Sequence, residues 1–170
     1  MKKQTLIIVF STLLLFCISC SVAYKFNGAS IDYSKTKTIC IHDFTNRAQM
    51  VYPPLTDTFN ESLKDLFSRQ TRLSQVSRNG DMEIEGEIVG YDIAPMAIQA
   101  NAIAAETRLS VRINVRFTNN KNSDEDFERS YTSYRNFDSS YMLNDVQDEL
   151  IAEITKELVE YIYNDTVANW

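Results

Sequence analysis

The sequence predicts an α+β fold, a two-layer sandwich in which two helices pack on a four-stranded, mostly antiparallel sheet in the order β-α-β-β-β-α. Two segments repeat apolar residues at helical spacing, three long segments alternate apolar and polar residues, and turn-forming residues separate them. Helices and a sheet with one apolar face each can bury those faces against one another. The chain of 170 residues is long enough for one domain with a single core.

The first strand is predicted at 38–44, where Ile39 and Ile41 share one face and Cys40 and His42 share the other. We interpret Cys40 as a small buried residue, because a free cysteine packs like an apolar side chain. We interpret His42, the only histidine of the chain, as a polar residue at the strand end rather than as a ligand.

Two helices are predicted, one from Pro53 to near Gln70 and one from Asn144 to Asn164. Proline is tolerated in the first helical turn, which favours a start at Pro53. Asn144 with Gln147 three residues later resembles a capping box. Each helix has one apolar stripe. The stripes consist of Leu55, Phe59, Leu63, Leu66 and Phe67 in the first helix, and of Leu143, Val146, Leu150, Ile154, Leu158, Tyr161 and Ile162 in the second.

Three longer strands are predicted at 82–94, 107–117 and 127–137. The second of them alternates most clearly, which is typical of an antiparallel strand with one face toward the core and one toward solvent. Its apolar face consists of Leu109, Val111, Ile113, Val115 and Phe117. In the first, the apolar positions change phase after Val89, which predicts a β-bulge near Gly90.

Two rows of charged residues lie on the polar faces of these strands. We interpret the glutamate row as a solvated face. The arginine row has two interpretations: it pairs with the glutamates across the strands, or it contacts anionic groups of a lipid. The rows are Glu83, Glu85 and Glu87 on one strand and Arg108, Arg112 and Arg116 on the next.

The connector between residues 95 and 105 contains neither glycine nor a charged residue. One interpretation is contact with a partner or a lipid through Met96, Ile98 and Ile103, because exposed apolar patches mark interaction sites. The other is that the connector only extends its two strands into a long hairpin with an apolar tip. The sequence leaves both interpretations open.

The N-terminus has the layout of a secretory signal peptide, with Lys2 and Lys3 before an apolar run at 6–16. The run is shorter than the ~20 apolar residues that a membrane-spanning helix needs, so a signal-anchor helix is disfavoured. Removal of residues 1–19 would leave 151 residues, with 15 basic against 23 acidic side chains.

The residues before Cys20 resemble a bacterial lipobox, in which small residues precede a cysteine that is lipidated and becomes the new N-terminus. Ser19 fits this motif, whereas Cys17 stands where leucine is usual. Cleavage by ordinary signal peptidase is the alternative, and a Cys-x-x-Cys redox pair is disfavoured inside an apolar run. Ser21, rather than aspartate, follows Cys20, which by analogy predicts passage to the outer membrane. We therefore expect a signal peptide at 1–19, a lipidated tether at 20–35 and a domain at 36–170.

Composition excludes several function classes. The formal charge of -6 disfavours a nucleic-acid partner. With 4 glycines and 3 cysteines, the chain has no glycine-rich phosphate loop, no zinc pattern and no disulfide scaffold. No nucleophile motif accompanies His42. We therefore expect no catalytic residues, no cofactor and no metal; a hydrolase using His42 is a remote alternative.

Taken in order, several short segments resemble the lipopolysaccharide-assembly lipoprotein family LptE, in the form found in Bacteroidetes. They are the lipobox at Cys20, Ile39-x-Ile41-x-x-Phe44-x-Asn46, Pro54 at the helix start, Thr71-x-Leu73 before Gly80-Asp81, Glu85-Gly86-x-Ile88-x-x-Tyr91, Arg108-Leu109-x-Val111, and Asn164-Asp165-x-Val167-Ala168-Asn169-Trp170. The resemblance covers nearly the whole mature chain and implies the same two-helix, four-stranded sandwich.

The resemblance also implies a function. Proteins of this kind are not enzymes; they plug the outer-membrane β-barrel LptD and help lipopolysaccharide reach the outer leaflet. Arg108, Arg112 and Arg116 are candidates for lipopolysaccharide contact by their type and face alone. The alternative function is a generic outer-membrane lipoprotein that binds a small lipid or another envelope protein.

Overall fold

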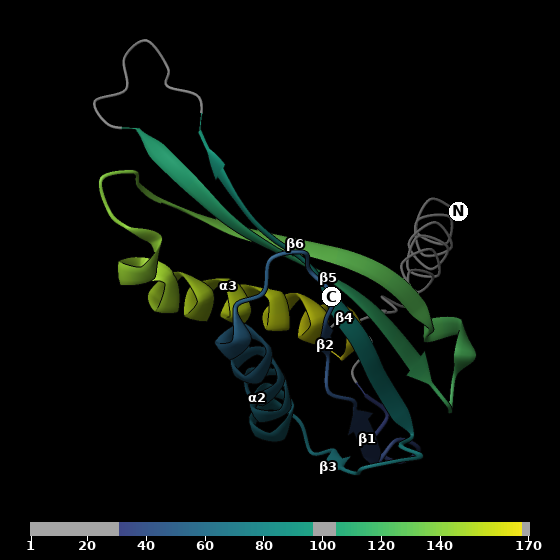
Figure 1. The fold of residues 1–170 in the computed structure, drawn as a ribbon. Coiled ribbons are helices and arrows are strands. Elements are labelled where there is room, and N and C mark those ends of the chain that lie inside the picture. Colours follow the sequence, from purple (N-terminus) through teal and green to yellow (C-terminus); the bar gives the residue numbers. More distant parts are fainter. Residues whose placement is uncertain (1–30, 97–104, 168–170) are drawn as a thin grey trace, which may run out of the picture.

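The computed structural model describes residues 31–96 and 105–167, so the predicted signal peptide, Cys20, Ile98 and Ile103 lie outside the described residues. The elements follow the chain in the order shown in Figure 1. They are β1 (Thr38–Ile41), β2 (Thr45–Asn46), α2 (Pro53–Gln70), β3 (Ser74–Gln75), β4 (Met82–Pro95), β5 (Glu106–Asn119), the short 3-10 helix η2 (Ser123–Glu125), β6 (Phe127–Asp138) and α3 (Leu143–Thr166).

Among the described residues the sheet is mixed and has six strands, so the prediction of four mostly antiparallel strands is wrong in number and in kind. Its order is β3-β1-β4-β5-β6, and β2 also pairs with β4. The long strands β4, β5 and β6 form an antiparallel meander. The short strands run parallel to their neighbours, because α2 returns the chain between β1 and β4 to the end of the sheet from which β1 started.

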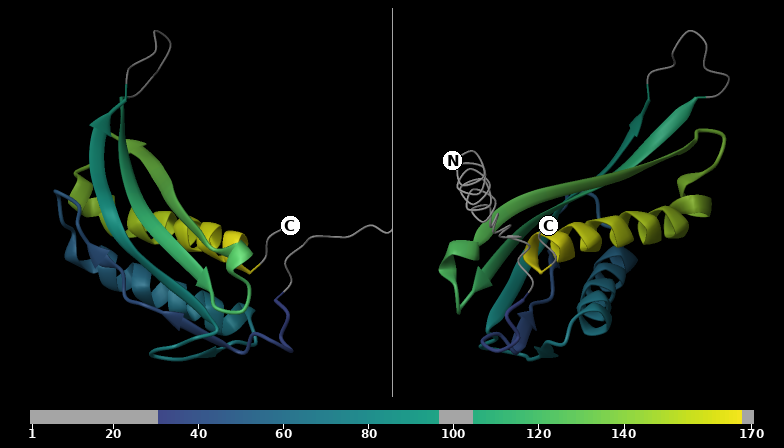
Figure 2. Two further views of the ribbon diagram at one scale, coloured as in Figure 1. Left: turned by 90° about the vertical axis from the view of Figure 1, so that its right-hand side faces the viewer. Right: turned by 180° about the vertical axis from the view of Figure 1, so that it is seen from behind.

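The helices α2 and α3 lie on one side of the sheet, and within residues 31–96 and 105–167 no other element covers the opposite side (Figure 2). The predicted α+β architecture with two layers is therefore confirmed at this level. The part of β4 and β5 nearest residues 96 and 105 projects beyond the helices (Figures 1 and 2). Within the described residues, neither helix combines the length and the apolar character needed to cross a membrane.

Helix α2 follows the prediction closely. It begins at Pro53 and ends at Gln70, and four of its five predicted stripe residues are buried, with Leu66 packed at the margin of the core. At its C-terminus, the Thr71 hydroxyl donates a hydrogen bond to the Phe67 carbonyl, 2.7 Å away. The side chain of Asn60 holds the segment after β1, because its Oδ1 accepts a hydrogen bond of 2.8 Å from the Phe44 amide.

The predicted capping box of α3 is wrong. The helix begins at Leu143, one residue before Asn144, and its N-cap is Met142, whose side chain makes no capping hydrogen bond. Asn144 is therefore the second residue of the helix and not its N-cap, and Gln147 is buried. The apolar stripe of α3 nevertheless packs in the core, for instance through Ile154 and Leu158. Tyr161 was predicted to belong to this stripe, but it keeps 38% of its surface exposed.

The register of β4 and β5 shifts between Ile88 and Gly90, which confirms the predicted bulge. Before the bulge, Gly86 faces the helix layer, opposite Val115 of β5. A Cβ at Gly86 would overlap the Asn114 carbonyl oxygen and would lie 2.7 Å from Cζ of the Phe44 ring. Glycine at this position therefore allows the Phe44 ring to lie against the sheet, 4.9 Å from the Phe59 ring between centroids.

Strand β6 and helix α3 are joined by a polar network rather than by apolar contacts alone. Arg135 pairs with Glu157 at 2.7 Å and with Glu153 at 2.7 Å. The Ser133 hydroxyl donates to the same Glu157 carboxylate at 2.8 Å, and the Tyr161 hydroxyl also donates to it. Hydrogen bonds from Tyr161, Arg135 and Ser133 lower the pKa of Glu157 from 4.5 to about 2.

This shift predicts an acid-dependent contribution to stability. Because the folded pKa of Glu157 lies below the unfolded value, its contribution is present above about pH 4.5 and is lost as the pH falls toward 2. Replacing Glu157 by glutamine is expected to reduce the free energy of unfolding by about 1–2 kcal/mol at pH 7, after allowance for solvent screening of a partly exposed carboxylate. Urea denaturation at pH 7 and pH 2 measures the difference.

Glu160→Gln is the matched control, because Glu160 is an exposed residue of the same helix. It is expected to change the free energy of unfolding by no more than about 0.5 kcal/mol at either pH. A loss for Glu157→Gln that is equally large at pH 7 and pH 2 would contradict a charge-dependent role of this carboxylate.

Candidate functional site

The uncovered side of the sheet, which we call the open face, presents the polar side chains of β4, β5 and β6. The alternation predicted from the sequence places the glutamate row and the arginine row on this face, and the β4–β5 register sets Glu85 opposite Arg116. The three candidate arginines therefore lie in a line along β5. They differ strongly in what surrounds each guanidinium.

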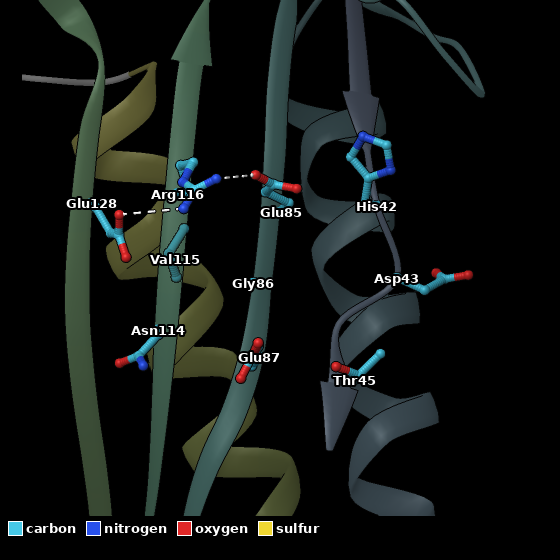
Figure 3. Close-up of a pocket in the computed structure, with 10 residues that line it drawn as sticks. All are labelled: His42, Asp43, Thr45, Glu85, Gly86, Glu87, Asn114, Val115, Arg116 and Glu128. Atoms are coloured by element: carbon cyan, nitrogen blue, oxygen red, sulfur yellow. Dashed lines mark hydrogen bonds and ion pairs between the residues drawn. The ribbon is translucent and has the colours of Figure 1, made fainter. Parts of the chain in front are cut away.

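Arg116 is neutralised by two carboxylates. Its guanidinium lies 3.0 Å from Glu85 Oε1 and 3.6 Å from Glu128 Oε2, on the strands to either side (Figure 3). This is the cross-strand pairing that one interpretation of the sequence predicts. All three side chains are more than half exposed, so each pair contributes only a few tenths of a kcal/mol.

A shallow groove of about 380 Å³ surrounds this ion pair. It lies between the β1–β2 segment, which provides Asp43, and the strands β4 to β6 (Figure 3). Its charged lining consists of four carboxylates, from Asp43, Glu85, Glu87 and Glu128, against the single guanidinium of Arg116. Such an acidic lining repels phosphate groups, so this groove is a poor site for an anionic lipid.

Arg108, nearer the projecting end of β5, is different. Its guanidinium lies over the ring of Tyr134, with Cζ 3.9 Å from the ring centroid, and its Nε donates to Asn136 Oδ1 at 3.0 Å. Asn136 in turn donates a hydrogen bond of 2.9 Å from its Nδ2 to Glu106 Oε2. Among the residues that the structure describes, no carboxylate oxygen lies within 4.0 Å of the Arg108 guanidinium. The cation–π contact holds the side chain in place and leaves the charge unpaired.

Arg112 lies between these two extremes, because its guanidinium is 3.8 Å from Asp92 Oδ2 and half exposed. The open face is therefore divided along its length. The part around Arg116, near the C-terminal end of β5, is acidic and internally paired, whereas the end near residues 96 and 105 has the more available positive charge. Tyr134 and Asn136 complete the Arg108 site, and the alternation of apolar and polar residues did not mark either of them.

The apolar connector is described only at its ends. Met96 is partly buried, and its amide donates to the Glu106 carbonyl at 2.8 Å, which closes the described part of the hairpin. Ile93, two residues before Pro95, keeps 36% of its surface exposed. Ile98 and Ile103 lie outside the described residues, so their predicted contacts remain predictions.

Cys40 and His42 lie on one side of β1, as predicted, and Cys40 is buried with 1% of its surface exposed. His42 has two neighbours that the sequence did not predict: its Nε2 is 3.5 Å from Cys40 Sγ and 3.9 Å from Glu83 Oε2. Burial raises the pKa of the Cys40 thiol, and the nearby Glu83 charge raises it further. A thiol with a raised pKa is a poor nucleophile.

Both neighbours of His42 approach the same ring nitrogen, so the imidazole does not connect an acid to a thiol as a catalytic triad does. Within 31–96 and 105–167, no group of three or more His, Cys, Asp or Glu side chains is arranged to hold a metal ion. The described residues around His42 therefore offer no evident catalytic or metal chemistry.

The family model for lipopolysaccharide assembly, LptE, matches residues 36–166. No curated protein matches the sequence. Among solved structures, a neuraminyllactose-binding hemagglutinin homolog from Helicobacter pylori is 12% identical, with a TM-score of 0.52 over 84% of this chain and 88% of that chain. A hypothetical protein from Chlamydia trachomatis is 10% identical, with a TM-score of 0.51 over 79% and 99%. These two likenesses concern the fold alone.

Proposed function

The chain belongs to the LptE family of lipopolysaccharide-assembly proteins. From this membership we propose that it is a non-catalytic, lipid-anchored subunit that plugs an LptD-type β-barrel. In that position it would assist the passage of lipopolysaccharide into the outer leaflet of the outer membrane. The observation that carries the proposal is the family match, which extends over both helices and all six strands.

The shape of the domain supports this proposal. A subunit inside a barrel needs a polar surface for the barrel wall and a part that reaches along the barrel axis. The open face provides exposed polar side chains on three adjacent strands. The hairpin of β4 and β5, with 14 residues in each strand, provides the projecting part. By the usual rise per residue, each of these strands spans about 45 Å.

Affinity purification from solubilised outer membranes tests the proposal. We expect an LptD-type barrel to be recovered with the tagged protein at close to equal amounts. We also expect depletion of the protein to reduce the lipopolysaccharide that reaches the cell surface. Recovery without any such barrel, together with unchanged lipopolysaccharide export, would instead favour the generic lipoprotein.

We propose further that Arg108 contacts an anionic group of lipopolysaccharide. Its partly exposed position, its unpaired charge and its support by Tyr134 all favour this role. Arg108→Gln is expected to weaken binding of purified lipopolysaccharide about tenfold, the usual effect of removing one charged hydrogen-bond partner. Surface plasmon resonance with immobilised protein measures the change.

Arg116→Gln is the matched control on the same face of the same strand. Because Glu85 and Glu128 already occupy its guanidinium, this change is expected to alter lipopolysaccharide binding less than about threefold. Equal losses in the two variants would indicate a diffuse electrostatic effect rather than a contact made by Arg108.

We also propose that the connector contacts the barrel lumen or acyl chains through Met96, Ile98 and Ile103. Introducing aspartate at both Ile98 and Ile103 is expected to reduce recovery of the barrel at least about tenfold, because a charge buried in an apolar contact is costly. The matched control is a variant with serine at Ile98 and Ile103, which is polar but adds no charge. The amount of barrel recovered is compared between the two variants. Unchanged recovery with aspartate would favour the simple hairpin tip.

A further inference from the structure

The short strands β1 and β3 lie at the end of the sheet opposite the projecting end of β4 and β5 (Figure 1), and three cationic residues lie in the segments that flank these two strands. Lys37 directly precedes β1, Arg72 lies two residues before β3, and Arg78 lies in the loop that follows β3. Parallel pairing brings these segments together, since the Ser74 amide donates to the Lys37 carbonyl at 2.9 Å. We call Lys37, Arg72 and Arg78, with Tyr33, the basic end.

The loop that contains Arg78 is held against β1. After Arg78 the chain passes so close to β1 that a Cβ at Gly80 would lie 2.5 Å from the Cys40 amide nitrogen and 3.0 Å from the Ile39 carbonyl carbon. The carboxylate of Asp81, the residue after Gly80, accepts two backbone hydrogen bonds: one of 2.8 Å from the Lys37 amide and one of 3.1 Å from the Thr38 amide. The backbone on both sides of the basic end is therefore fixed by tertiary contacts.

The charges of the basic end are not neutralised within the described part of the chain. Lys37, Arg72 and Arg78 are exposed, and no described carboxylate oxygen lies within 4.0 Å of their charged nitrogens. The neighbouring Asp81 is already engaged, because it accepts two backbone amides and pairs with Lys121 at 2.9 Å. Three positive charges thus remain available at one end of an acidic protein.

An aromatic side chain accompanies these charges. Tyr33 keeps 37% of its surface exposed, and its ring centroid lies 5.8 Å from Cζ of Arg72. Its hydroxyl accepts a hydrogen bond of 3.5 Å from the Arg72 amide. Tyrosine with adjacent arginine or lysine is typical of surfaces at the level of lipid head groups, where an apolar ring and a polar tip are both satisfied.

The position of the tether identifies the partner of the basic end. Ile31, the first described residue, is buried beside Met82 and Thr166, at the same end of the sheet as β1. Cys20 precedes Ile31 by 11 residues, which span at most about 40 Å when fully extended. If Cys20 holds the acyl chains, as proposed above, the anchor keeps this end close to a lipid surface.

We propose that the basic end binds the phosphate groups of phospholipid head groups in the membrane leaflet that holds the anchor. Each cation near an anionic lipid surface strengthens binding about fivefold. Asp32, next to Tyr33, is paired with Lys35 at 3.5 Å. Acidic residues on distant parts of the domain oppose binding little, because physiological salt screens charges beyond about 8 Å. A short tether also gives a millimolar effective concentration, so weak individual contacts suffice.

Photo-crosslinking in vesicles tests this inference with the full mature, lipidated chain. A photoreactive residue replaces Ser77, which is exposed beside Arg78. The protein is reconstituted in vesicles of phosphatidylcholine with or without about one-third phosphatidylglycerol, a composition chosen to give an anionic surface. Mass spectrometry then counts phospholipid adducts. We expect adducts to phosphatidylglycerol, and at least about tenfold fewer when Lys37 and Arg78 are both replaced by glutamate.

The matched control replaces Arg47 and Lys156 by glutamate, which changes the net charge equally at two other exposed positions. This control is expected to retain the adducts. Circular dichroism verifies that both variants are folded. If glutamate at Lys37 and Arg78 disturbs the fold, a variant with glutamine at both positions replaces it in the same experiment. Equal adduct yields in the basic-end and control variants would overturn the inference. So would adducts to lipopolysaccharide alone when the vesicles contain it.

The same experiment separates this inference from the proposed anchoring. If Cys20 is not lipidated, the protein will not float with the vesicles of phosphatidylcholine alone, which offer the basic end no anionic surface. If the basic end does not bind head groups, the protein will float but yield no phospholipid adducts at Ser77. The vesicles contain no barrel, so neither result depends on the proposed LptD-type partner.

Discussion

Replacing Gly86 by alanine is expected to lower the free energy of unfolding by about 2–3 kcal/mol, the range typical of overpacking a dense core. The added methyl group would overlap the Asn114 carbonyl oxygen of β5 and the Phe44 ring. Neither can move freely: Asn114 belongs to a central strand paired on both sides, and the Phe44 backbone is held by Asn60. Urea denaturation with a two-state fit measures the change.

Gly90→Ala on the same strand is the matched control. A Cβ at Gly90 would lie 3.1 Å from Asp92 Oδ2 and 3.2 Å from Cβ and from a guanidinium nitrogen of Arg112. Two of these three atoms belong to the ends of flexible side chains, which can move away. We therefore expect Gly90→Ala to cost less than about 1 kcal/mol. Similar losses at both positions would show that the Phe44 ring adjusts as easily as a surface side chain.

Replacing Cys20 by alanine is expected to abolish lipid labelling and to prevent lipid anchoring of the mature protein. The expected loss is complete, because three acyl chains at about 0.8 kcal/mol per buried CH₂ would otherwise hold the protein in the membrane almost irreversibly. Metabolic labelling with a radioactive fatty acid such as palmitate, followed by fractionation of the cells, measures both effects.

Cys17→Ala is the control for this prediction, because Cys17 lies three residues earlier in the same apolar segment and would be removed with the signal peptide. We expect this variant to be labelled and to remain with the outer membrane. Labelling that survives Cys20→Ala would contradict the lipobox interpretation and, with it, the proposed division at residue 20.

The long elements of the fold could be predicted from the sequence because each has a periodic apolar face that must be buried. The strand predicted at 107–117 corresponds to β5, and the helix predicted from Pro53 to Gln70 corresponds to α2. Strands β2 and β3 contain two residues each, too few to show any alternation. The parallel pairing of β1 with β4 also lacks a local signal, because it depends on where α2 returns the chain.

The candidate site was predictable in part for the same reason. Strand alternation was enough to place Arg108 and Arg116 on one face. It could not show that Arg108 lies over Tyr134, because that contact depends on the register between β5 and β6. Nor could it show that Lys37 and Arg78 flank the same end of the sheet, since that depends on the pairing of β1 with β3 and on the loop that crosses β1.

The polar network between β6 and α3 also affects how copies of the protein meet one another. β6 is an edge strand of the described sheet, and such strands can pair with a neighbouring chain and start aggregation. Arg129 and Arg135 of β6 turn toward α3, where Asp165, Glu153 and Glu157 bind them. Charges that point inward from an edge strand would be desolvated by an added strand. This arrangement therefore opposes edge-to-edge pairing between copies of the protein.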